Sequence, residues 1–318
     1  MNTTRDRRRS GNPAVRAAAE RLAGAGGPAR ITWRDWVGGA RLRTLPLAVA
    51  PVAAGAGLAS LAHGFSWTLT LLALAVAVLL QIGVNYANDY SDGIRGTDAH
   101  RVGPTRLTGS GLVNPKRVLA TALVFFALAA VAGLAAVVIS GRWWFLAIGA
   151  VAILAAWFYT GGKRPYGYAG LGEVAVFVFF GIVATVGTVW LQTDLELQEP
   201  WIAGAGVGFF AVAVLVVNNT RDIETDRAAG KRTLSVRIGD RASRILYTVC
   251  VLLPFAVPGV YFMVYPGMLL VWFVLVLVIP AIVITLWART ARELVLVLGL
   301  TSLAALAYGV LLGVAFAF

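Results

Sequence analysis

Residues 66–98, SWTLTLLALAVAVLLQIGVNYANDYSDGIRGTD, combine the two features that decide the fold and indicate the chemistry. An apolar run of about 20 residues is long enough to cross a hydrocarbon core of roughly 30 Å as an α-helix. Such a run covers residues 66–88 and ends directly in a cluster of Asn, Asp and Arg side chains. The sequence therefore predicts a transmembrane helix with a polar site at one end.

The remainder of the chain has the same apolar character. Of its 318 residues, 59% are hydrophobic and 13% are charged, and the mean hydropathy is +0.78. A soluble domain is about half apolar and about a quarter charged, so lipid is the expected solvent. We expect an all-α polytopic membrane protein with nine transmembrane helices, near residues 45–62, 66–88, 117–139, 143–160, 171–192, 200–221, 244–265, 267–288 and 294–317.

The positions of the basic residues predict the orientation. Of 27 Lys and Arg residues, 26 fall in segments on one side of the alternating topology, and Arg142 is the exception. Cytoplasmic loops are the ones enriched in Lys and Arg. We therefore expect a multi-pass protein of the cell membrane with its N-terminus in the cytoplasm and its C-terminus outside. The net charge of +12 reflects this orientation, so membrane lipid is an expected partner and nucleic acid is not.

The N-terminal segment differs in composition from the rest. Residues 1–30 contain several Arg residues followed by Ala and Gly, and no apolar run follows closely enough for a signal peptide. We expect a basic, disordered cytoplasmic tail over residues 1–30. Residues 31–318 are expected to form a single membrane domain.

Two loops on the basic side share one pattern. The first begins VNYANDYSDG at Val84, and the second begins VNNTRDIETD at Val217. Each contains Asn-x-x-x-Asp, at residues 85–89 and 218–222, and each continues to Thr-Asp, then Gly and basic residues. Two four-helix units followed by a ninth helix would explain this spacing. In membrane proteins built from repeats, binding sites commonly lie at the interface between the repeats.

The aspartates in these loops are suited to a hard cation. Asp89 and Asp92 are spaced i, i+3, and Asp222 and Asp226 are spaced i, i+4, so each pair falls on one face of a helix. Clustered carboxylates repel one another unless cations lie between them. Mg²⁺ usually binds one or two carboxylates together with waters and substrate phosphate oxygens. A single such Asp more often solvates a helix end, but the duplicated pattern favours a Mg²⁺–diphosphate site.

Basic residues surround both motifs. They lie after the first motif, around the second motif, in the loop at residues 159–168 and before the first predicted span. Any one of them is explained by membrane orientation alone. Together with Mg²⁺, they would neutralise the charge that develops on a departing diphosphate.

With these motifs the chain resembles the UbiA superfamily of intramembrane aromatic prenyltransferases, whose members have nine helices and motifs of the approximate form NDxxDxxxD and DxxxD. Residues 88–92 match the first motif and residues 222–226 match the second. The third aspartate of the family would fall at Gly96, and Asp98 lies two residues later. The similarity extends from Arg41 to the end of the chain.

The resemblance implies a Mg²⁺-dependent enzyme that transfers a polyprenyl group from polyprenyl diphosphate to an aromatic acid. The carboxylates that would hold Mg²⁺, and hence would be catalytic, are Asp89, Asp92, Asp222 and Asp226, with Asp98 as a further metal ligand. The residues that would contact the two substrates are Asn85, Asn88, Lys163, Arg221, Lys231, Tyr159 and Arg43. Tyr159 would shield an allylic cation, and Arg43 would pair with the carboxylate of the acceptor.

Within the superfamily, the loops at residues 101–111 (RVGPTRLTGSG) and 159–173 (YTGGKRPYGYAGLGE) are most similar to the MenA branch. That branch prenylates 1,4-dihydroxy-2-naphthoate with loss of CO₂ and gives demethylmenaquinol, the precursor of menaquinone. Related transferases of the 4-hydroxybenzoate, chlorophyll or haem O type are the alternatives. A transporter is a more distant alternative, since the predicted spans have no Asp, Glu, Lys or Arg near their centres.

Overall fold

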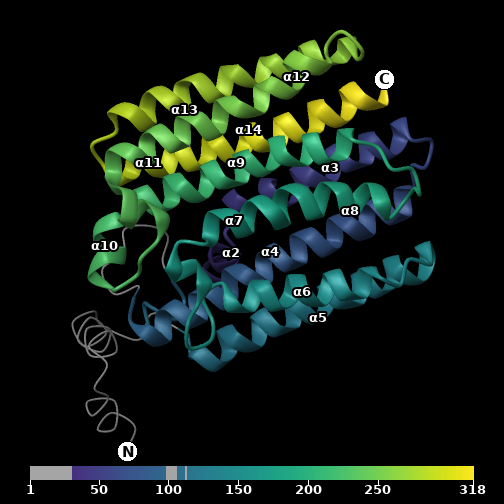
Figure 1. Ribbon diagram of the computed structural model, residues 1–318. Coiled ribbons are helices and arrows are strands. Elements are labelled where there is room, and N and C mark those ends of the chain that lie inside the picture. Colours follow the sequence, from purple (N-terminus) through teal and green to yellow (C-terminus); the bar gives the residue numbers. More distant parts are fainter. Residues whose placement is uncertain (1–30, 98–105, 112) are drawn as a thin grey trace, which may run out of the picture.

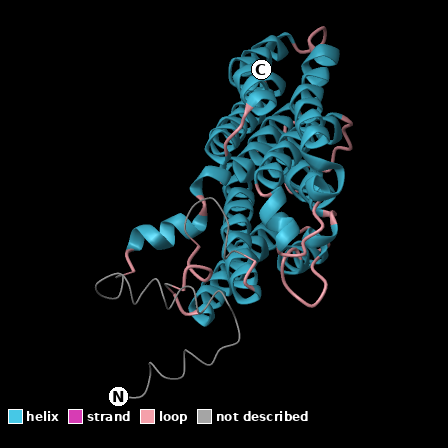
Figure 2. Cartoon of the chain, turned by 90° about the vertical axis from the view of Figure 1, so that its left-hand side faces the viewer, coloured by secondary structure: helices cyan, strands magenta, loops and turns pink. Residues whose placement is uncertain are grey.

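The computed structural model describes residues 31–97, 106–111 and 113–318, so the predicted tail at residues 1–30 and Asp98 lie outside the described residues. Helices joined by short loops make up the described chain (Figure 2), as the sequence predicts. The helical elements are α2 (Trp33–Ala40), η2 (Leu42–Thr44), α3 (Pro46–Leu61), α4 (Trp67–Arg95), α5 (Pro115–Ser140), α6 (Phe145–Phe158), η3 (Tyr166–Ala169), α7 (Gly172–Val176), η4 (Phe177–Val183), α8 (Ala184–Trp190), α9 (Glu199–Arg221), α10 (Ile223–Ala228), α11 (Leu234–Leu252), η5 (Leu253–Phe255), α12 (Ala256–Tyr261), η6 (Pro266–Val274), α13 (Leu275–Trp287) and α14 (Ala291–Ala317).

Eight of the nine predicted spans correspond to segments that can cross a membrane. In the described chain, seven helical segments are long and apolar enough, and the α2–η2 segment with α3 makes an eighth as a pair bent by 48°. The bend follows Arg41, whose φ of 51° is left-handed, and Pro46 begins the next helix. The protein is therefore a multi-pass membrane protein.

The fourth predicted span, residues 143–160, is shorter than expected. It forms α6, an apolar helix of 14 residues that lies beside α5 (Figure 1). At 1.5 Å per residue it is about 21 Å long, which is less than the roughly 30 Å of a hydrocarbon core. Turns at residues 143–144 and 159–160 end the helix on either side. Within the described residues, each of the nine predicted apolar segments is thus helical, but α6 falls short of a full span.

α9 lies at the centre of the bundle. Of its apolar window, 72% is buried inside the protein, against 22% for α4 and 28% for α5. It packs against α11, α14 and η4, which explains why its buried face is almost entirely apolar. The outer helices expose large apolar side chains instead, as expected for surfaces that contact lipid.

Small residues allow two close helix crossings. A Cβ on Gly309 of α14 would lie 2.3 Å from the carbonyl oxygen of Ala50 in α3. A Cβ on Gly181, in the π-helical segment η4, would lie 2.5 Å from the Cα of Gly208 in α9. Close approach of backbones through small residues is a common way to pack helices in membranes. These crossings hold α3, η4 and α9 around the cavity described next.

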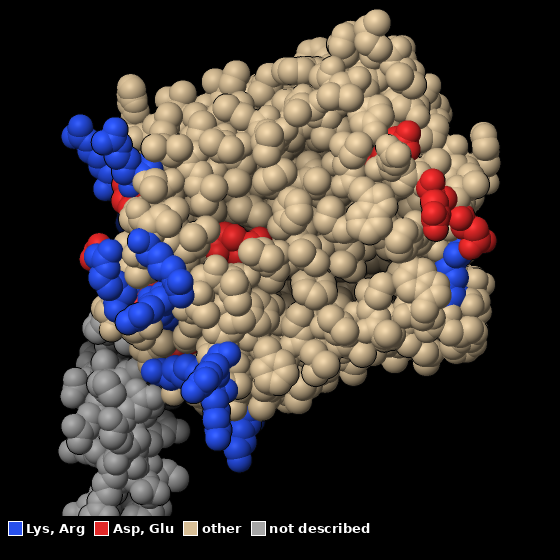
Figure 3. All heavy atoms as spheres, viewed as in Figure 1, with Lys and Arg blue, Asp and Glu red and all other residues tan. Residues whose placement is uncertain are grey.

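Charged side chains gather at the two ends of the bundle. On the face shown in Figure 3, Lys and Arg cluster at one end, while the other end has acidic residues and little basic charge. At the acidic end, the Arg142 guanidinium pairs with Asp194 at 2.6 Å. The separation of charge agrees with the pattern of the sequence, and the cytoplasmic position of the basic end stays a prediction.

Candidate functional site

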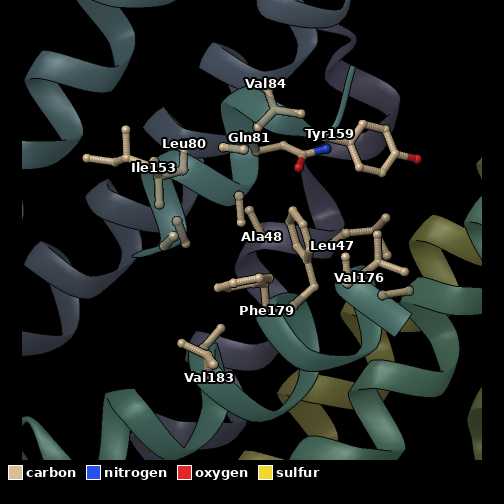
Figure 4. A pocket seen from close by; sticks show the side chains of 18 of the residues that line it. Leu47, Ala48, Leu80, Gln81, Val84, Ile153, Tyr159, Val176, Phe179 and Val183 are labelled. Atoms are coloured by element: carbon tan, nitrogen blue, oxygen red, sulfur yellow. The ribbon is translucent and has the colours of Figure 1, made fainter. Parts of the chain in front are cut away.

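A cavity runs through the interior between α3, α4, α5, α6, α9 and the α7–η4–α8 segment. Its volume is about 580 Å³, and its body is lined by apolar side chains, several of which are shown in Figure 4. The lining residues on α4 extend from Ala73 to Asp92, which corresponds to about 28 Å along the helix axis. The cavity therefore has an apolar body of nearly membrane length and a polar end at the motif residues.

The first motif brings three polar side chains to the polar end. Asn85, Asn88 and Asp92 line the cavity, and their spacing of i, i+3, i+7 places them on one face of α4. The Asn85 side chain donates to the carbonyl of Ala40 at 2.9 Å, and the Thr160 hydroxyl donates to Asn88 Oδ1 at 2.7 Å. Both amides are thus held in fixed orientations beside Asp92.

The Asp92 carboxylate is contacted by side chains from three other segments of the chain. It is 3% exposed, and its Oδ1 accepts from Lys231 Nζ at 3.3 Å and from the Tyr168 hydroxyl. Its Oδ2 lies 3.9 Å from the Arg106 guanidinium. Burial, and then the charge of Asp92, raise the pKa of Tyr168, so its hydroxyl stays protonated and donates to the carboxylate.

Lys231 connects the two motifs. Its ammonium lies 3.3 Å from Asp92 and 3.7 Å from Asp226 Oδ1, and 4.6 Å from the centre of the Tyr168 ring. Asp92 and Asp226 are 134 residues apart in sequence, yet one cation contacts both. The geometry therefore brings the two predicted motifs to one end of one cavity.

Asp222 lines the cavity with a fixed carboxylate. Arg221 donates to both of its oxygens, from Nε to Oδ1 at 2.7 Å and from Nη2 to Oδ2 at 2.6 Å. The same Nη2 donates to Asn218 Oδ1 at 3.0 Å. Arg221 was expected to contact a diphosphate, but it does not line the cavity. Its guanidinium is committed to holding Asp222 and Asn218 in place.

Asp89, predicted as a metal ligand, binds backbone groups of a neighbouring loop in the ligand-free protein. It is 1% exposed and does not line the cavity. Its two oxygens accept the backbone N–H groups of Leu107 and Thr108, at 2.9 and 2.8 Å. The loop lies so close to α4 that a Cβ on Gly93 would be 2.3 Å from the Thr108 side chain. Asp89 thus fixes the loop that places Arg106 beside Asp92.

Two basic residues that were predicted to contact the substrates lie outside the cavity lining. Lys163 and Arg43 are exposed, and neither lines the cavity. Arg41, two residues before Arg43, does line it, because its left-handed backbone turns the chain between α2 and η2. The basic segment before the first span thus contributes Arg41 to the cavity lining, and the predicted contact of Arg43 with the substrate stays a prediction.

Tyr159 lines the cavity as predicted, and other polar residues there were not singled out from the sequence. Arg106 is one of the basic residues that follow the first motif, and the sequence gives no separate prediction for Tyr168 or Asn219, although all three line the cavity. Asn219 donates to Glu173 Oε1 at 3.0 Å, and Glu173 is a buried carboxylate at the start of α7. Their only sequence signal is proximity to the motifs and to the loop at residues 159–173.

The donor set fits a Mg²⁺ ion that is shared with a substrate. Among the described residues, no three His, Cys, Asp or Glu side chains are grouped closely enough to hold a metal by themselves. Asp92, Asp222 and Asp226 nevertheless line the same cavity end. Mg²⁺ needs only one or two carboxylates when substrate phosphates complete its coordination. Asp98, the further predicted ligand, lies outside the described residues.

The fold and the cavity define the class of protein. It is a polytopic α-helical membrane protein with a long apolar internal cavity and a charged end made of carboxylates, Lys and Arg. Such a cavity matches an amphiphile that has a long apolar chain and an anionic head.

Comparison with known proteins gives the family. Residues 48–298 match the family described as the UbiA prenyltransferase family, so the chain belongs to that family of membrane prenyltransferases. A relative from Mycobacterium tuberculosis, 1,4-dihydroxy-2-naphthoate octaprenyltransferase, is 48% identical over 304 residues, which are 90% of this chain and 98% of the relative.

Solved structures of UbiA homologues have the same fold. The apo structure of a homologue from Aeropyrum pernix K1 has a TM-score of 0.64 at 14% identity and covers 85% of this chain and 96% of that one. A homologue from Archaeoglobus fulgidus, determined with GPP and Mg²⁺ bound, has a TM-score of 0.60 at 16% identity and covers 86% of this chain and 98% of that one.

Proposed function

We propose that the chain transfers a polyprenyl group from polyprenyl diphosphate to 1,4-dihydroxy-2-naphthoate, with loss of CO₂, and so makes demethylmenaquinol for menaquinone synthesis. The naphthoate activity is that of the M. tuberculosis relative, to which the chain is similar over nearly the whole length of both proteins. The observation that supports the reaction most directly is a cavity with an apolar body and a Lys231-linked carboxylate end.

The donor would lie along α4 with its diphosphate at the polar end. The apolar body matches an isoprenoid chain, which gains free energy by leaving contact with water. Lys231 and Arg106 are directed at Asp92 in the absence of substrate. Both are positioned to contact phosphoryl oxygens, because Arg and Lys donors suit phosphate groups.

The residues that would hold Mg²⁺ are Asp92, Asp222 and Asp226. When bound, Mg²⁺ would neutralise negative charge on the diphosphate and so assist its departure. Arg221 would keep the Asp222 carboxylate in one orientation by its two hydrogen bonds. Tyr168, through its donation to Asp92, would do the same for the other motif. Asp89 would act on the loop at residues 106–111 rather than on the metal.

The bond changes balance without an additional reactant. The carbon–oxygen bond to the diphosphate breaks, and the diphosphate departs with the electron pair. The electron-rich naphthoate carbon that has the carboxylate forms the new carbon–carbon bond. The carboxylate then leaves as CO₂, and its bonding electrons restore the aromatic ring. The apolar cavity would exclude water from the allylic cation, with the Tyr159 ring at its polar end.

The acceptor carboxylate requires a cation. Arg43 and Lys163 were the expected partners, but they are exposed and do not line the cavity. Arg41 lines the cavity near its polar end, and we assign it this role. A paired carboxylate avoids the cost of an isolated charge in an apolar surrounding.

An acceptor panel tests the proposal. The purified protein is incubated with Mg²⁺, a polyprenyl diphosphate and either 1,4-dihydroxy-2-naphthoate or 4-hydroxybenzoate, and the products are identified by mass. The naphthoate should give a prenylated product that has lost the mass of CO₂, and 4-hydroxybenzoate should stay unchanged. Efficient prenylation of 4-hydroxybenzoate with the naphthoate unchanged would contradict the naphthoate as acceptor but would not affect the family assignment.

A further inference from the structure

A second pocket lies on the outside of the bundle, separate from the prenyl cavity. It has a volume of about 540 Å³ and is formed where α11 meets the end of α13. It shares no lining residue with the large cavity. The residues that line it are Asp240, Arg241, Arg244, Leu286, Trp287, Ala288 and Arg289.

The pocket has an excess of positive charge. Its one carboxylate, Asp240, pairs with Arg244 Nε at 2.7 Å, and Arg244 also donates to the carbonyl of Thr285. No ion pair within 4.0 Å joins the side chain of Arg241 or Arg289 to another described residue. The Glu293 carboxylate, which accepts from the Arg289 backbone N–H at 2.9 Å, interacts electrostatically with the Arg289 guanidinium but does not line the pocket. Two exposed guanidinium groups therefore face one pocket in which the carboxylate is already neutralised.

Apolar surface continues from the pocket along the helices. Ile245 and Val249 follow Arg241 at intervals of four residues on α11, so all three share one face. Ile245 is 54% exposed, Val249 is 51% exposed, and Trp287 beside the arginines is 67% exposed. Trp is enriched where a membrane meets water. The surface thus presents cations at the level of lipid headgroups and apolar side chains at the level of acyl chains.

We propose that this pocket binds an anionic phospholipid, with the phosphate between Arg241 and Arg289 and an acyl chain along the exposed face of α11. Basic pockets between transmembrane helices bind anionic headgroups, and guanidinium groups match phosphate geometry. The pocket lies at the end of the bundle where Lys and Arg gather (Figure 3). A soluble phosphate would share the headgroup chemistry but would not use the apolar face.

Titration of the full-length protein in a neutral detergent tests the proposal. Bound lipid is counted by native mass spectrometry as dioleoyl phosphatidylglycerol, dioleoyl phosphatidylcholine or glycerol phosphate is added. The test variant is Arg241→Gln/Arg289→Gln. The control variant is Lys116→Gln/Arg117→Gln, which removes equal charge from two exposed residues at the start of α5. Prenyl transfer by both variants checks that they are folded.

Phosphatidylglycerol should bind the parent and the control with the same apparent Kd. The pocket variant should bind it roughly 30-fold more weakly, as expected for two arginines near one anionic headgroup. Phosphatidylcholine and glycerol phosphate should bind far more weakly to all three proteins. Equal weakening in the pocket and control variants would mean that only general charge attraction acts, and would overturn the site. Glycerol phosphate binding as tightly as the lipid would also overturn the lipid assignment.

Discussion

At the scale of single residues, the polar end of the cavity is organised around one buried ammonium group. Lys231 is 7% exposed and contacts a carboxylate from each motif. A buried cation between two carboxylates is stabilised by both of them, and each carboxylate is costly to leave without a partner. In the free protein Lys231 therefore holds the two motifs together, and in the complex it would contact the diphosphate.

The two lysines predicted as diphosphate contacts provide a matched test. Lys231→Gln should raise the KM for polyprenyl diphosphate and lower kcat by at least ~100-fold, because a charge that stabilises the leaving group is lost. Lys163→Gln should leave both constants within about twofold, since Lys163 is exposed and does not line the cavity. Steady-state kinetics at fixed naphthoate measure both. A larger effect of Lys163→Gln than of Lys231→Gln would place the diphosphate at the loop of residues 159–168.

Substitutions of Asp89 and Asp92 should likewise have different effects, one on the stability of the fold and the other on catalysis. Asp92→Asn should lower kcat by at least ~100-fold and raise the Mg²⁺ concentration needed for half-maximal activity. Asp89→Asn should leave that Mg²⁺ requirement unchanged. It should instead destabilise the fold by about 1.5–3 kcal/mol, because a buried charge-assisted hydrogen bond is lost.

Thermal melts and Mg²⁺ titrations of the two variants are the measurements. Glu196→Gln, at an exposed carboxylate, serves as the control for loss of one negative charge. If Asp89→Asn shifted the Mg²⁺ requirement as much as Asp92→Asn, Asp89 would be a metal ligand and its contact with the loop would be secondary.

These residues show how far the sequence predicts the site. Motif spacing predicts that Asn85, Asn88 and Asp92 share one face of α4, because that depends only on helix geometry. It does not predict that Asp89, at the edge of the same face, binds backbone N–H groups about 18 residues later. Such a contact depends on how a loop folds back over the helix. The choice between Arg41 and Arg43 likewise depends on one left-handed backbone turn.

At the scale of elements, α14 illustrates how the bundle is held together. Gly309 allows its backbone to approach α3, whereas Gly299, on the same helix, has no atom within 4 Å of the position of a Cβ. The hydrophobic effect does not drive helices together within lipid, so close packing of backbones contributes more of the stability. α3 also lines the cavity, so this crossing supports the site.

Alanine substitutions at these two glycines test the crossing. Gly309→Ala should lower the melting temperature in detergent, because the added methyl group displaces α3 at a cost of typically about 1–3 kcal/mol. Gly299→Ala should leave it unchanged or raise it slightly, since Ala has the higher helix propensity. Equal melting temperatures for the two variants would show that the α3–α14 contact is not tight.

The sequence predicts that these helical segments exist, but it does not predict where each one ends or bends. Apolar length alone located nine helical segments, because a run that long has few alternatives in a membrane. It could not locate the early end of α6, the π-helical turn of η4 or the 48° bend before α3. Those features depend on turns and on packing against neighbouring helices. Two of them, α6 and η4, line the cavity and so shape the site.

At the scale of the whole molecule, the separation of charge predicts the orientation in the membrane. Cysteine at Gly230, introduced in a Cys250→Ala background, should react with an impermeant reagent only from the cytoplasmic side. Cysteine at Asp194 should react only from outside. Both positions are exposed, and the native Cys250 is buried. Labelling of intact cells and of inverted membrane vesicles measures this. Labelling of both positions from one side would contradict the topology.

The stoichiometry of CO₂ release measures whether the chain prenylates the naphthoate with decarboxylation. The protein is supplied with Mg²⁺, a polyprenyl diphosphate and 1,4-dihydroxy-2-naphthoate labelled in its carboxyl carbon. Labelled CO₂ and prenylated product are then measured together, with Asp92→Asn as the inactive control. We expect one CO₂ for each molecule of prenylated product from the parent, and neither CO₂ nor product from Asp92→Asn. Product that retains the labelled carboxylate, or turnover by Asp92→Asn equal to that of the parent, would contradict this expectation.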